Sequence, residues 1–62
     1  MNEQNEAAKR LRNKADECRA MAEHMANAIS RDSFLQMARG YDHLAEQIER
    51  IESIRQAKLR AS

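Results

Sequence analysis

The chain has 62 residues and nearly balanced charge, with 11 Lys and Arg against 10 Asp and Glu. Proline is absent, glycine occurs once, and Tyr41 and Phe34 are the two aromatic residues, a composition that favours helix and argues against a β-sheet. A chain this short buries a small core, so we expect one all-α domain of two helices at most.

The amino end, residues 1–6, is polar and acidic and lacks the apolar core of a secretory signal. No apolar run approaches the ~18 residues that a membrane-spanning helix requires. Cys18, the single cysteine, has no second cysteine for an internal disulfide, which suits a reducing compartment. We therefore expect a cytoplasmic protein with no membrane partner.

A first amphipathic helix is predicted over about residues 5–28. Its apolar residues follow one another in steps of four and three, the a/d pattern of a helix that packs along another helix. This first seam consists of Leu11, Ala15, Cys18, Ala22, Met25 and Ile29.

A short turn is predicted at about residues 29–31. Ser30 can cap the following helix, and Ile29 and Phe34 occupy the two positions of a hydrophobic staple. Because the connection is short, the helices on either side of it are expected to be antiparallel neighbours.

A second helix is predicted over about residues 31–59, with its own heptad seam. Folding the chain about the turn places Ala22 opposite Tyr41, and Cys18 opposite Leu44 and Ala45. The second seam consists of Phe34, Met37, Tyr41, Leu44, Ile48 and Ile51.

A narrower apolar stripe runs beside the main seams, formed by Ala7, Met21 and Ala28 on the first helix and by Leu35, Ala38 and Ala45 on the second. An apolar face this wide exceeds what one partner helix covers, and a two-helix core is too small for stability on its own. The sequence therefore predicts a homo-oligomer, with a dimeric four-helix bundle favoured and the subunit orientation left open. The residues expected to form the core and the self-association surface are Leu11, Ala15, Cys18, Met21, Ala22, Met25, Ile29, Phe34, Leu35, Met37, Tyr41, Leu44, Ile48 and Ile51.

No catalytic, cofactor or metal site is predicted. The serines have no convincing histidine partner, and there is no glycine-rich loop for a phosphate. His24 and His43 lack the Glu-x-x-His spacing of helical metal sites, so exposed surface histidines are the simpler reading. We expect a protein that is not an enzyme.

Basic residues gather where the two chain ends meet in an antiparallel hairpin. They are either solubilising side chains or a site for the phosphates of RNA or DNA. No aromatic residue lies among them, which argues against stacking on a single strand. The candidate phosphate-binding residues are Lys9, Arg10, Arg12, Lys14, Arg55, Lys58 and Arg60.

Two segments, residues 11–23 and 34–47, read roughly as R-x-K-A-x-E-C-R-x-x-A-E followed by F/W-L-x-M-A-x-x-Y/W-x-x-L-A-E-Q. In this pattern the chain resembles a family of short bacterial two-helix proteins of unassigned activity. The resemblance implies a helical hairpin and no reaction. Together with the seams, it leads us to expect a non-catalytic, self-associating protein-interaction or regulatory module, with a small nucleic-acid-binding regulator as the alternative.

Overall fold

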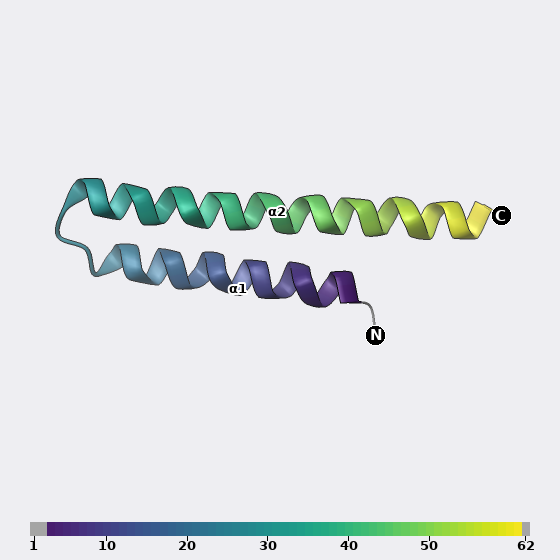
Figure 1. Cartoon of the computed structure of the whole chain (residues 1–62), viewed down its shortest axis with the longest axis horizontal. Coiled ribbons are helices and arrows are strands. Elements are labelled where there is room, and N and C mark those ends of the chain that lie inside the picture. The colour runs from purple at the N-terminus through teal and green to yellow at the C-terminus, as the bar shows by residue number, and fades with distance from the viewer. Residues whose placement is uncertain (1–2, 62) are drawn as a thin grey trace.

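Two α-helices make up the computed structural model, which describes the backbone of residues 3–61 and the side chains of residues 6–61. Helix α1 (Glu3–Glu23) and helix α2 (Ala28–Ala61) lie side by side and run in opposite directions (Figure 1). The predicted all-α hairpin is therefore confirmed.

The turn occupies residues 24–27, earlier in the chain than the predicted 29–31. α1 ends at Glu23 rather than near residue 28, where the amides of His24 and Met25 donate to the carbonyls of Met21 and Ala22, both at 3.1 Å. These bonds span three residues and tighten the last turn of the helix. No non-glycine residue in the described backbone has positive φ, so the helix ends without a left-handed cap.

Asn27 begins α2. Its side-chain Oδ1 accepts hydrogen bonds from the amides of Ile29 at 2.8 Å and Ser30 at 3.2 Å, the geometry of an N-cap. The predicted cap at Ser30 and the staple between Ile29 and Phe34 are therefore wrong. Ser30 already lies inside the helix, and Ile29 is 79% exposed.

The seam between the helices is lined mostly by alanine. Apart from Cys18, the buried residues repeat at seven-residue steps, a spacing that keeps side chains on one stripe of a helix. Phe34 and Tyr41 pack against the buried cluster of Ala15, Cys18 and Ala38. The buried residues are Ala8, Ala15, Cys18 and Ala22 on α1, and Ala38, Ala45 and Glu52 on α2.

On α1 the predicted seam agrees with the burial of Ala15, Cys18 and Ala22. On α2 it is displaced: the hairpin buries the alanines that were expected to flank the seam, while Met37, Leu44 and Ile51 point outward. The residues that face each other across the seam also differ from the prediction: Cys18 belongs to a buried cluster with Ala38, and Leu44 is not part of that cluster. The earlier turn changes the register, and small alanine side chains let the two helices lie close together.

Glu52 continues the alanine series at the end of the seam and is 8% exposed. Its Oε1 accepts a hydrogen bond from Gln56 Nε2 at 3.4 Å, and its Oε2 lies 3.9 Å from Arg55 Nη1. A carboxylate thus occupies the level at which the apolar seam stops.

The molecule is one helix thick, with extents of 54 × 18 × 10 Å. Its radius of gyration is 15.2 Å, whereas a compact domain of this length has about 11 Å. α2 has 34 residues and α1 has 21, so α2 continues past the start of α1 (Figure 1). Neither helix, over its described residues, is long and apolar enough to cross a membrane.

Candidate functional site

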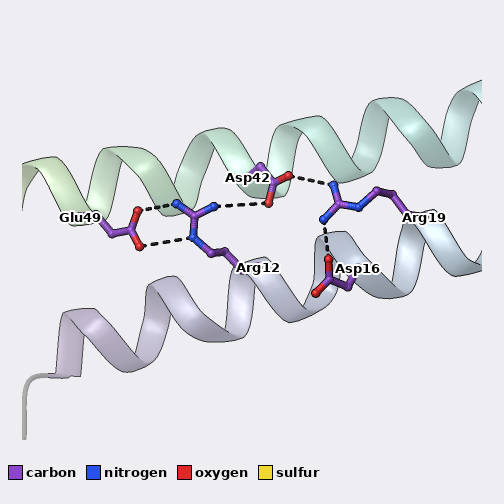
Figure 2. Close-up of polar contacts among 5 residues, drawn as sticks. All are labelled: Arg12, Asp16, Arg19, Asp42 and Glu49. Atoms are coloured by element: carbon purple, nitrogen blue, oxygen red, sulfur yellow. Dashed lines mark hydrogen bonds and ion pairs between the residues drawn. The ribbon is translucent and has the colours of Figure 1, made fainter.

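One side of the hairpin carries ion pairs between the helices, shown in Figure 2. Arg12 donates from Nη2 and Nε to the two carboxylate oxygens of Glu49, at 2.5 and 3.3 Å, and its Nη1 lies 3.8 Å from Asp42 Oδ1. Arg19 donates to Asp42 at 2.9 Å and also to Asp16 on its own helix. We call Arg12, Arg19, Asp42 and Glu49 the ion-paired flank.

These contacts shift the ionisation of the groups that make them. Hydrogen bonding to Glu49 raises the pKa of Arg12, and hydrogen bonding to Asp16 and then Asp42 raises the pKa of Arg19. The hydrogen bonds from Arg12 hold the pKa of the Glu49 carboxyl below its ordinary value. Because the side chains in these pairs remain 31–71% exposed to solvent, the pairs fix register more than they add stability.

The opposite side of the seam is apolar. Leu44 and Ile51 follow Asp42 and Glu49 by two residues, a rotation of about 200° around the helix that carries them across the seam. Met37 lies one heptad before Leu44 and therefore on the same side of α2. On α1, Met21 follows Arg19 by two residues, and this step likewise places Met21 across the seam from the ion pairs. We call Met21, Met37, Leu44 and Ile51 the apolar flank; each is 47–52% exposed.

A hollow of about 370 Å³ opens on this flank, lined by Met37, Gly40, Tyr41 and Leu44. These residues stand at positions i, i+3, i+4 and i+7 of α2, the diamond that receives one side chain of a facing helix in knobs-into-holes packing. A Cβ built on Gly40 meets no atom within 4 Å, so the glycine leaves this diamond wide open.

The predicted core residues therefore fall into three groups. Ala15, Cys18 and Ala22 are buried in the seam. A second group is half-buried along its edges: Leu11, Met25, Phe34, Leu35, Tyr41 and Ile48. A third group is exposed: Met21, Ile29, Met37, Leu44 and Ile51.

Sequence reasoning missed Ala8 as a core residue and placed Ala38 and Ala45 outside the main seam. It also missed the ion-paired flank. The signal was present, since alanine recurs every seven residues on each helix, with oppositely charged residues at matching flanking positions.

The structure does not gather the candidate phosphate-binding residues at one end, as the sequence predicted. Arg12 lies across from Asp42 and Glu49 in the middle of α2, whereas Arg55, Lys58 and Arg60 stand in the last two turns of α2, which continues past the start of α1 (Figure 1). Several already face carboxylates of their own chain: Arg12 binds Glu49, Lys14 Nζ lies 3.8 Å from Glu17, and Arg55 lies 3.9 Å from Glu52. Lys9 and Arg10 are exposed near the start of α1, and Lys58 and Arg60 stand in the last turn of α2. The intrachain pairs reduce the positive charge that Arg12, Lys14 and Arg55 offer to phosphate.

Within the part of the chain that the structure describes, no group of three or more His, Cys, Asp or Glu side chains is placed to hold a metal ion. Cys18 is a free thiol buried between the helices.

No family model, curated protein or solved structure matches this chain.

Proposed function

We propose that this protein is a non-catalytic interaction module that associates with a second copy of itself to form a four-helix bundle. The observation that carries the proposal is the distribution of side-chain size. Small residues fill the seam within the chain, while Met21, Met37, Leu44 and Ile51 remain about half exposed on one flank. Burial of such large apolar side chains is the main source of folding free energy, so the hairpin leaves part of its core uncovered.

The exposed area supports the same proposal. The chain exposes 5000 Å² to solvent, whereas a folded monomer of 7.2 kDa is expected to expose about 4,100 Å². The excess of about 900 Å² is close to the ~800 Å² that each partner buries in a protein interface of ordinary size. One further hairpin against the apolar flank would cover an area of this order.

The two flanks suggest which side stays in water. Arg12 and Arg19 already satisfy Asp42 and Glu49 across the ion-paired flank, and burying these charges would cost desolvation energy. The apolar flank carries no such cost. Association through it would leave the ion pairs on the outside of the bundle.

The proposal is tested by sedimentation equilibrium over protein concentrations from micromolar to millimolar. We expect the wild type to be a dimer, and the triple variant Met37→Gln, Leu44→Gln, Ile51→Gln to sediment as a monomer of reduced helicity. The matched control is the triple variant Arg39→Gln, His43→Gln, Arg50→Gln, whose positions are exposed on α2 away from the flank. The control should remain a dimer.

A well-folded wild-type monomer throughout this range would overturn the proposal. The alternative function is checked by a mobility-shift assay with duplex DNA and structured RNA across a salt titration. Binding that weakens steeply with salt would favour the nucleic-acid-binding regulator, because phosphate contacts release counterions.

A further inference from the structure

The geometry points to a specific contact within that dimer: α2 packs antiparallel on α2 of the second copy, about a two-fold axis that passes near Leu44. This inference rests on the proposed function and adds to it the identity and direction of the helix that covers the apolar flank.

The apolar flank of α2 is self-complementary about Leu44. Met37 lies one heptad before Leu44 and Ile51 lies one heptad after it, and Leu44 stands at the middle of Ala28–Ala61. A two-fold rotation at this level lays the two helices along each other for their full length. It brings Met37 of each copy to the level of the other copy's Ile51. Isologous interfaces of this kind are the commonest in homodimers.

The hollow on α2 fits the same arrangement. Met37, Gly40, Tyr41 and Leu44 form an open diamond on one side of the proposed axis. On the other side, Ile48 is half-buried and Ile51 is exposed, so both present apolar surface to a neighbour. The two-fold rotation carries the second copy's segment 44–51 over the diamond, and each copy supplies the side chain that the other receives.

α1 is a poorer partner for this flank. It has 21 residues against the 34 of α2, so an α1 from the second copy would leave the end of α2 uncovered, including Ile54, which is 52% exposed. Lys14 also lies midway along the corresponding side of α1, one heptad before Met21, and its side chain is 61% exposed. α2 offers a longer partner, whose apolar flank continues from Met37 through Leu44 to Ile51.

Distances between spin labels on the two copies test the direction of packing. Single cysteines are introduced at His43 and at Ala57 in a Cys18→Ser background; both sites are exposed and fall on the same outer face of α2, two heptads apart. With 1.5 Å of rise per residue, the antiparallel arrangement predicts about 40 Å between labels at position 57 and less than about 25 Å at position 43. Short distances at both positions would indicate parallel α2 helices and overturn the inference.

A second test uses the hollow itself and needs no labels. Gly40→Leu fills the diamond, and the open space around Gly40 within the hairpin accommodates the side chain. We expect the dissociation constant of the dimer to rise at least about tenfold. The added side chain would occupy the space that receives a side chain of the second copy, while the seam between α1 and α2 is unchanged. Ala57→Leu adds the same side chain elsewhere on α2 and should leave the constant unchanged.

The two proposals fail differently. A wild type that stays monomeric would remove the dimer altogether. A dimer with short distances at both label positions, or with the same affinity after Gly40→Leu, would keep the proposed function and reject the α2 contact.

Discussion

Asn27 fixes the point at which the chain reverses. One side-chain oxygen satisfies two amides of the first turn of α2, which have no partner within the helix. Ser30 offered similar capping chemistry from the sequence, and several polar residues in a row leave the choice of cap open. The cap that forms is the one that lets both alanine stripes face each other.

Asn27→Ala should lower the free energy of unfolding by about 1 kcal/mol, since alanine cannot accept the amide hydrogen bonds. Urea unfolding followed by circular dichroism measures the change. Asn13→Ala is the matched control, because Asn13 is exposed in the interior of α1 and alanine is the better helix former there. An equal loss in both variants would contradict the capping role.

The alanines explain why the core was only partly predictable. Sequence patterns weight large apolar residues, and on α2 these form a regular heptad series through Met37, Leu44 and Ile51. The neighbouring series of Ala38 and Ala45 has the same period. Periodicity alone cannot rank two adjacent stripes, and the closer approach that alanine allows decided which one faces α1.

At the scale of the elements, the existence and type of both helices followed from composition and period, whereas their ends did not. α1 stops five residues before its predicted end although the apolar pattern continues through Met25 and Ile29. Helix-favouring residues on both sides of the turn give little local signal for a boundary. In this hairpin, the packing of one helix on the other sets where α1 ends and α2 begins.

The pairing of α1 with α2 should depend on pH through Glu49. Its pKa is lowered in the folded chain by hydrogen bonds from Arg12, so its contribution is present above the ordinary carboxyl pKa and is lost as the pH falls through the folded value. We expect the melting temperature of the wild type to fall between about pH 5 and pH 3. In Glu49→Gln the fall over this range should be smaller, and an identical pH profile would contradict the role of the pair.

At the scale of the whole molecule, the hairpin is one helix thick, so both of its broad faces are exposed to solvent. We propose that association covers the apolar one. Binding that favours the folded state raises stability with concentration. The melting temperature followed by circular dichroism should therefore rise by several degrees over a hundredfold increase in protein concentration. The triple glutamine variant provides the comparison, and its melting temperature should not depend on concentration.

The sequence predicted which residues form the candidate interaction surface better than it predicted where on the hairpin that surface lies. The residues of the apolar flank were all named from the sequence as core or self-association residues, but the two roles were not separated. Only the positions of Arg12, Arg19, Asp42 and Glu49 reveal which side of the hairpin is closed by ion pairs. Those contacts join residues far apart in the chain, which helical spacing within one element cannot predict.

The alanine-lined seam has a consequence for mutational surveys. Alanine scanning locates a core by truncating side chains, and at Ala8, Ala15, Ala22, Ala38 and Ala45 there is nothing to truncate. Such a scan would therefore report no change in stability at these seam positions, and changes in stability only at the larger side chains around them. A scan with larger residues would show the reverse, because each added methyl group has to push two closely packed backbones apart.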